Sequence, residues 1–222
     1  MHQGLIKGAT SWIKDNFAFF AIGAFTAGYW ATAVFGNLNI GIRHVLITFP
    51  FLYLLCVWGV KKIVEYMPNL RTKKYVLGAI GLLVLAFAAS SALAYPYYLS
   101  YYNELAGGKN TGYRIAVDSN YDWGQDFYRL QDKIKKHNID QISIHYFGGE
   151  DPAYWLGDKY IPYNPKIMQR PTGWLAVSVN ELMGGNAKAV AGYDQQTGYY
   201  DWLKTYTPID RAGTSILLYY IQ

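Results

Sequence analysis

Three long apolar segments occupy the first 95 residues and restrict the possible folds of this chain more than any other sequence feature. Residues 17–35 (FAFFAIGAFTAGYWATAVF) and 75–95 (YVLGAIGLLVLAFAASSALAY) contain no charged side chain, and residues 45–60 form a shorter apolar run between them. A helix needs about 20 mostly apolar residues to cross the hydrocarbon core of a bilayer. The sequence therefore predicts that residues 1–95 form a three-helix transmembrane region.

The charges around these segments predict which way the chain crosses the membrane. Residues 1–95 carry eight Lys and Arg against two Asp and Glu, whereas residues 96–222 carry twelve against thirteen. Basic residues that flank apolar runs indicate membrane anchoring rather than nucleic-acid binding, and they favour the cytoplasmic side. Three crossings put both basic clusters on that side, so the loop 36–44 and residues 96–222 are expected outside. The clusters comprise Lys7 and Lys14, and then Lys61, Lys62, Arg71, Lys73 and Lys74.

Residues 96–222 show the alternating pattern of an α/β domain. Apolar, β-branched and aromatic runs predict strands, and the spacing of Trp123, Phe127, Leu130 and Ile134 predicts a helix over 122–137. Asp151 and Pro152 are an N-cap and first-turn pair for a short helix, and residues 199–206 are a further helix candidate. Strands that alternate with helices favour one sheet with mostly parallel pairing. The predicted strands are 113–117, 141–147, 174–179 and 215–221.

The first candidate binding site is the pair Arg43 and His44, at the outer mouth between the first two apolar segments. One interpretation is an arginine that extends its charged end from the apolar region into the interface. The other is a binding site for an anion at the membrane surface, such as a lipid phosphate. Arginine suits phosphate because its planar guanidinium donates two hydrogen bonds at fixed geometry. The residues alone leave both interpretations open.

The second candidate is the segment VDSNYDWGQDFYRL at 117–130, which gathers short polar side chains around an indole. Such residues cap helix starts. They also bind the hydroxyls of a sugar, while an exposed ring covers the sugar's apolar face. An EF-hand is disfavoured, because the glycine comes one position late and the twelfth position is arginine. Trp123 fits a core position equally well. The candidate sugar- or acceptor-binding residues are Asp118, Asn120, Asp122, Trp123 and Gln125.

Motifs of soluble enzymes and of metal or cofactor sites do not occur in the sequence. There is no nucleophile elbow, no Walker loop and no dinucleotide-binding glycine pattern, and the four histidines have no metal-ligand spacing. We therefore expect no metal and no cofactor. The glycine pairs in 148–150 and 183–186 are interpreted as turns. Cys56 is the single cysteine, so no internal disulfide can form.

Several stretches together resemble a known family of membrane enzymes. NIGIRHVLITFPFLY, YPYYLSYYNELAGG, GYRIAVDSNYDWGQDFYRL and GTSILLYYI are similar to the C-terminal part of bacterial GT-C superfamily glycosyltransferases. These include protein O-mannosyltransferases and aminoarabinose transferases. The likeness runs from about Asn37 to the C-terminus, and VDSNYDWGQD is its most specific part. One departure is Ile47, where the family pattern has proline.

This resemblance implies transfer of a sugar from a polyprenyl-phosphate donor to an acceptor, at the outer face of a bacterial inner or plasma membrane. It places Arg43 and His44 near the donor phosphate. It also implies a catalytic acid in the first extracytoplasmic loop of a longer chain. The loop 36–44 contains no Asp or Glu, so we name no catalytic residue and expect a missing N-terminal half. The alternative is a non-catalytic membrane-anchored subunit or binding module of a larger membrane complex.

The predicted topology is tested by cysteine labelling in intact cells. In a Cys56→Ser background, a membrane-impermeant reagent should modify a cysteine placed by Asn186→Cys and should not modify one placed by Lys73→Cys. The reason is the Lys and Arg bias on one side of three crossings. Labelling at position 73 with protection at position 186 would contradict the predicted orientation in the membrane.

Overall fold

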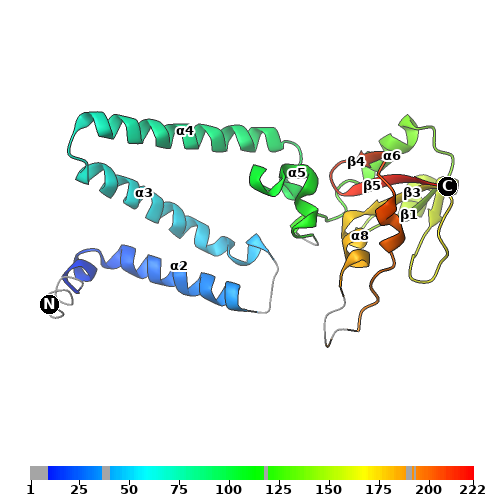
Figure 1. The fold of residues 1–222 in the computed structure, drawn as a ribbon, viewed down its shortest axis with the longest axis horizontal. Helices are drawn as coiled ribbons and strands as arrows, with labels where there is room; N and C mark the ends of the chain where they lie inside the picture. The colour runs from blue at the N-terminus through cyan, green and yellow to red at the C-terminus, as the bar shows by residue number, and fades with distance from the viewer. Residues whose placement is uncertain (1–9, 37–40, 118–119, 189–191, 193) are drawn as a thin grey trace. The chain divides into compact units, whose positions relative to one another are not determined.

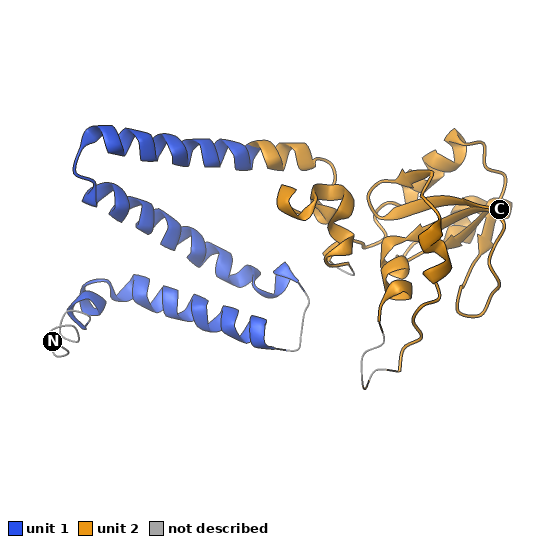
Figure 2. Ribbon diagram, in the orientation of Figure 1, with its two compact units in different colours: residues 1–88 blue, residues 89–222 orange. Residues whose placement is uncertain are grey.

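The structure is a computed structural model that describes residues 10–36, 41–117, 120–188, 192 and 194–222. The chain divides into two compact units, Met1–Ala88 and Ala89–Gln222 (Figure 2). The boundary falls inside a long helix, so the last turns of that helix belong with the second unit. Each unit is described by itself.

The first unit contains helices that are long and apolar enough to cross a membrane (Figure 1). Across the described residues there are three such helices, and they match the apolar segments at 17–35, 45–60 and 75–95. The second of them continues from a short 3₁₀ turn, η2 (Leu46–Thr48). The helices are α2 (Phe17–Phe35), α3 (Phe49–Tyr66) and α4 (Leu70–Ala94), the last of which enters the second unit.

Aromatic side chains hold α2 against α3. The Phe19 and Trp58 rings stack with centroids 4.7 Å apart, and the Phe25 ring meets the Phe51 ring edge-on at 5.4 Å. Much of the remaining surface is apolar and exposed, as at Phe87, whose side chain is 73% accessible. Such a surface is unfavourable in water, whereas it suits contact with lipid acyl chains.

The second unit is built on a five-stranded mixed sheet with the order β2-β1-β3-β5-β4. β1 pairs in parallel with β2 and with β3, whereas β5 pairs antiparallel with β3 and with β4. The expectation of mostly parallel pairing is therefore wrong, because β5 runs antiparallel to both of its neighbours and joins β4 through a tight turn. The strands are β1 (Ile142–His145), β2 (Tyr160–Pro162), β3 (Gly173–Ser178), β4 (Asp210–Ala212) and β5 (Ile216–Ile221).

The predicted strands at 141–147, 174–179 and 215–221 are confirmed as β1, β3 and β5. The predicted strand at 113–117 is wrong, because this region starts with a 3₁₀ turn, η5 (Gly112–Arg114), and pairs with no strand. Its Tyr113 packs into the core instead. The predicted turn at 183–186 is also wrong, since it ends a helix, α8 (Val179–Asn186). Residues 199–206 contain a 3₁₀ helix, η8 (Asp201–Thr205), rather than an α-helix.

Helices cover both faces of the sheet and create two cores. On one face, α6 (Phe127–Lys136) and α7 (Pro152–Leu156) pack against the isoleucines of β1 and against Ile216 and Leu218 of β5. On the other face, α8 and η8 pack against Leu175 and Val177 of β3. Because side chains alternate along a strand, β3 and β5 supply both cores. Asp151 caps α7 by accepting a hydrogen bond from the Ala153 N–H at 2.9 Å, as predicted.

The helical stripe is confirmed for three of its four members. Phe127, Leu130 and Ile134 are buried on α6. Trp123 precedes the helix, and its side chain is 54% exposed, so its place in the stripe is wrong. The spacing of 4, 3 and 4 places Trp123 on the same face only if the helix extends back to it, and the described backbone at 121–126 is a series of turns.

Core packing by α6 is tested by truncating Leu130, which has no accessible surface. Leu130→Ala should reduce the free energy of unfolding of the second unit by about 2–5 kcal/mol, because it leaves a cavity between helix and sheet. Denaturant unfolding of the full chain in detergent, followed by near-UV circular dichroism, measures this loss. The exposed substitution Asp132→Ala on the same helix is the control and should change stability by less than about 0.5 kcal/mol. Equal effects of the two substitutions would contradict the assigned burial.

Candidate functional site

The Arg43 and His44 pair lies in a short 3₁₀ turn, η1 (Ile42–His44), which η2 follows directly. Two side chains of α2 hold this region. The Tyr29 hydroxyl donates a hydrogen bond to the His44 carbonyl at 3.0 Å, and Trp30 Nε1 donates to Thr48 Oγ1 at 3.0 Å. The backbone that carries the two cationic residues is therefore fixed at the start of α3.

The surroundings of this turn favour an anion. Arg43 is exposed and His44 is half-buried. On α3 the acidic residue is Glu65, which pairs with Lys61 and Lys62 at the opposite end of the helix. At 1.5 Å per residue, Glu65 lies roughly 25 Å along the helix from Thr48. The positive charge of the turn is therefore too far from the Glu65 carboxylate to form an ion pair with it.

The side chains of the second candidate segment are mostly engaged in the segment's own turns. Gln125 accepts a hydrogen bond from the Trp123 N–H at 2.7 Å and donates one to the Tyr121 carbonyl at 3.1 Å. Asn120 donates to the Val117 carbonyl at 3.3 Å. Among the described candidate residues of the segment, Trp123 is the exposed one. Asp118 lies outside the described residues, so the structure places four of the five predicted residues.

Asp122 is a buried carboxyl group with one incompletely satisfied oxygen. Its side chain has no accessible surface, and Oδ1 accepts a hydrogen bond from the Gly124 N–H at 3.0 Å. Within the described residues, neither Oδ2 nor the nearby Ser215 hydroxyl makes a well-aligned hydrogen bond. Burial raises the pKa of Asp122 to about 6, although the N–H groups of Gly124 and Asn180 and the Ser215 hydroxyl partly offset this rise. Asp122 therefore carries a costly charge at neutral pH.

A close backbone approach attaches this segment to the loop between β1 and α7. Gly124 has a φ of 79°, and a Cβ at this position would lie 2.6 Å from the Cα of Gly148. The Tyr146 hydroxyl donates a hydrogen bond to the Gly124 carbonyl at 2.8 Å. A glycine is needed here both for the backbone conformation and for the space. The segment thus supports the loop that carries residues 146–151.

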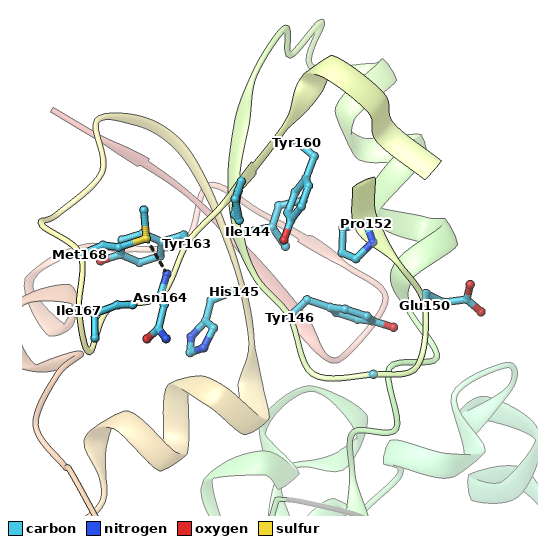
Figure 3. Close-up of a pocket in the computed structure, with 12 residues that line it drawn as sticks. Ile144, His145, Tyr146, Glu150, Pro152, Tyr160, Tyr163, Asn164, Ile167 and Met168 are labelled. Carbon is cyan, nitrogen blue, oxygen red and sulfur yellow. Dashed lines mark hydrogen bonds between the residues drawn. The ribbon is translucent and has the colours of Figure 1, made fainter. Parts of the chain in front are cut away.

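That loop borders a cavity of about 430 Å³ at the carboxyl ends of β1 and β2 (Figure 3). Parallel strands end at the same edge of a sheet, and ligands of open α/β sheets bind outside this edge. His145 and Asn164 lie side by side on one flank of the cavity, and Tyr146 and Tyr160 lie on the other. The walls combine aromatic and apolar surface with a few polar groups, as small-molecule sites do.

His145 is the functional candidate that sequence reasoning missed. Its Nδ1 lies 2.9 Å from the Tyr200 hydroxyl, and its Nε2 lies 3.4 Å from a Glu181 carboxylate oxygen. Burial, assisted by the positive charge of Lys166, lowers the pKa of His145 to about 4. The contact with Glu181 therefore involves a neutral imidazole at pH 7. The available signal was the position of His145 near the end of the predicted strand 141–147, shortly before the glycines at 148 and 149.

The described residues contain no group of three or more His, Cys, Asp or Glu side chains that could hold a metal ion. The candidate sites are therefore an exposed cationic turn in the first unit and, in the second, a cavity with a neutral histidine. The described groups of these sites are a guanidinium in the first, and a histidine, an asparagine and aromatic rings in the second. The arrangement supports ligand binding more directly than catalysis.

The unusual charge of Asp122 is tested by Asp122→Asn. The folded pKa lies above the ordinary value of 3.8, so the folded state binds more protons between about pH 4 and 6. The stability that this carboxyl contributes is full below pH 4 and is lost as pH rises through 6. Asparagine keeps the Gly124 bond and offers Ser215 a donor. The free energy of unfolding of Asp122→Asn, relative to that of the native protein, should therefore increase from pH 4 to 6 and then level off. The total increase should be up to about 3 kcal/mol.

Denaturant unfolding of the native chain and the variant across this pH range measures the difference, and other titrating groups cancel because both proteins contain them. Asp132→Asn, at an exposed position of α6, is the control and should parallel the native protein at every pH. A constant difference between Asp122→Asn and the native protein would contradict the raised pKa.

Known proteins provide no match to this chain. Comparisons with protein-family models, with curated proteins and with solved structures all returned nothing. The function is therefore inferred from the residues of the chain and their arrangement.

Proposed function

We propose that this chain is the C-terminal portion of an integral-membrane glycosyltransferase, which moves a sugar from a polyprenyl-phosphate donor to an acceptor on the outer membrane face. The sequence motifs that resemble the GT-C superfamily support this proposal, above all NIGIRH and VDSNYDWGQD. In this proposal α2, α3 and α4 cross the membrane and the α/β unit lies on the extracytoplasmic side. The Lys and Arg bias of the sequence supports that orientation.

The observation that carries the proposal is the anchored cationic turn at the start of α3. Hydrogen bonds from Tyr29 and Trp30 hold the turn between two helices of membrane-spanning length, while Arg43 is exposed. A cation at such a place costs a few kcal/mol in hydrocarbon and is stabilised by a headgroup anion. The phosphate of a polyprenyl donor combines such an anion with a tail that lies among the apolar helices.

In the proposed role, Arg43 donates two parallel hydrogen bonds to the phosphate, and His44 adds a donor from its ring. The resemblance places the catalytic acid in another extracytoplasmic loop, and 36–44 contains no Asp or Glu. This chain therefore contributes donor binding, and the catalytic group comes from the rest of the enzyme. The candidate acceptor-side residues remain Asp118, Asn120, Asp122, Trp123 and Gln125, of which Trp123 offers an exposed ring.

The proposal is tested by lipid binding to the full chain in nanodiscs, with a polyprenyl phosphate as the probe and the matching polyprenol as its phosphate-free reference. The native chain should prefer the phosphate. Arg43→Ala should reduce this preference about tenfold or more, because a charge-assisted bond is worth about 1.5–3 kcal/mol. Arg43→Lys should recover part of it, since a point charge replaces a bidentate fork. Native mass spectrometry measures the bound fractions.

Arg71→Ala is the matched control. Arg71 is also an exposed arginine near a helix end, but it lies in the first turn of α4, on the predicted cytoplasmic side. It should leave the phosphate preference unchanged. Equal binding of phosphate and polyprenol by the native chain, or an undiminished preference in Arg43→Ala, would favour the non-catalytic subunit and a purely interfacial arginine.

A further inference from the structure

A second, smaller cavity lies on the face of the α/β unit that carries α6 and α7. Its volume is about 180 Å³, and its walls come from α6, α7 and the two segments that precede these helices. The loop 146–151 separates it from the larger cavity, and Figure 3 shows the Glu150 carboxylate directed away from His145 and Asn164. The lining residues are Gln125, Phe127, Tyr128, Gln131, Glu150 and Trp155.

Two aromatic rings at this cavity are exposed, and neighbouring groups hold both in place. The Tyr128 side chain is 56% accessible and the Trp155 side chain 52%. Trp155 Nε1 donates a hydrogen bond to Glu150 Oε2 at 2.9 Å, which orients the indole. The Arg129 guanidinium lies 4.5 Å from the centroid of the Tyr128 ring. Large ring surfaces therefore remain in contact with water in defined positions rather than packing into the core.

Polar groups with unused hydrogen-bonding capacity lie between the rings. The Gln131 side chain is half-buried and makes no hydrogen bond to the described residues. Glu150 uses Oε2 for the indole, which leaves Oε1 as an acceptor. Together an amide and a carboxylate offer both a donor and acceptors, the combination that hydroxyl groups need. Unused polar groups beside exposed rings indicate a ligand that presents both hydroxyls and an apolar face.

We propose that this cavity is a carbohydrate-binding site that takes one pyranose unit of a neutral saccharide. The C–H face of a pyranose packs on the Trp155 or Tyr128 ring, and its hydroxyls bond to Gln131 and Glu150. Phe127, which is 2% exposed, forms an apolar floor. The volume is close to that of a single sugar ring and too small for a folded partner. This site goes beyond the proposed donor-phosphate role, because it binds a sugar between α6 and α7 rather than a phosphate at Arg43.

A membrane surface is the competing occupant of an aromatic rim, and the local charges disfavour it. Glu150 lines the cavity and the exposed Asp151 follows it in the chain, and both would be repelled by anionic headgroups. A neutral saccharide meets no such repulsion. The carboxylate also disfavours a free phosphate or a phosphorylated ligand.

The test is saturation-transfer NMR with the full chain in nanodiscs and a panel of methyl glycosides of glucose, galactose, mannose and N-acetylglucosamine as probes. At least one should bind saturably at millimolar concentration. Trp155→Ala should weaken this binding about tenfold, and Gln131→Leu should weaken it several-fold, the loss expected for a ring contact and for one hydrogen bond. Tyr220→Ala is the control, because Tyr220 is an exposed aromatic residue of the same unit and does not line this cavity.

Arg43→Ala separates this proposal from the donor-phosphate role, because it should leave sugar binding intact, just as Trp155→Ala should leave the polyprenyl-phosphate preference intact. Near-UV circular dichroism checks that each variant is folded. If Trp155→Ala is not folded, Gln131→Leu alone tests the cavity. The proposal is overturned if no glycoside of the panel binds saturably, or if binding survives the folded cavity variants unchanged. Quenching of Trp155 by brominated lipids without sugar binding would also overturn it and assign the rim to the membrane surface.

Discussion

The buried Asp126 carboxylate connects the helical layer of the α/β unit to its sheet. It accepts hydrogen bonds from the backbone N–H groups of Thr214 and Ser215 at 2.7 and 2.9 Å, and from Arg129 at 2.6 Å. Gly213 in the same turn has a φ of 57°, and a side chain there would collide with this carboxylate. An unpaired buried N–H costs about 1–3 kcal/mol, so the start of α6 and the turn between β4 and β5 depend on one residue.

The position of α6 in turn determines what the unit can bind. With its first turn held at the sheet edge, Phe127 and Leu130 face the core while Tyr128 and Gln131 face outward. Gly124 allows the loop of residues 146–151 to approach within contact distance, and this loop carries Glu150 next to α6. The same loop borders the cavity at the ends of β1 and β2. One supported loop therefore shapes two potential binding surfaces.

The two units present surfaces of different chemistry. The first unit presents a cationic turn whose backbone is held by Tyr29 and Trp30, beside helices that are apolar and of membrane-spanning length. This combination suits an anionic lipid headgroup. The second presents aromatic rings and neutral polar groups, which suit hydroxyl-rich ligands. The two surfaces can be tested by separate substitutions.

By itself, the sequence determined the elements whose signal is local. The apolar segments at 17–35, 45–60 and 75–95 predicted three helices, because length and composition alone decide whether a helix suits a bilayer. The runs at 141–147, 174–179 and 215–221 predicted strands, and Asp151 with Pro152 predicted a helix start, because hydrophobic runs and capping are also local properties. The sequence also indicated the Arg43 and His44 pair as a candidate site, because a basic pair beside apolar segments is a local feature.

Only the tertiary structure decided which segments pair and which side chains meet. Residues 113–117 read as a strand, yet no strand pairs with them, and Tyr113 packs in the core from a 3₁₀ turn. The short strands β2 and β4 have three residues each and gain their structure from their partners rather than from a hydrophobic pattern. Gln131 and Trp155 are far apart in sequence and line one cavity because α6 and α7 pack on the same face. Such neighbours depend on long-range packing, which the hydrophobic pattern of a single segment does not encode.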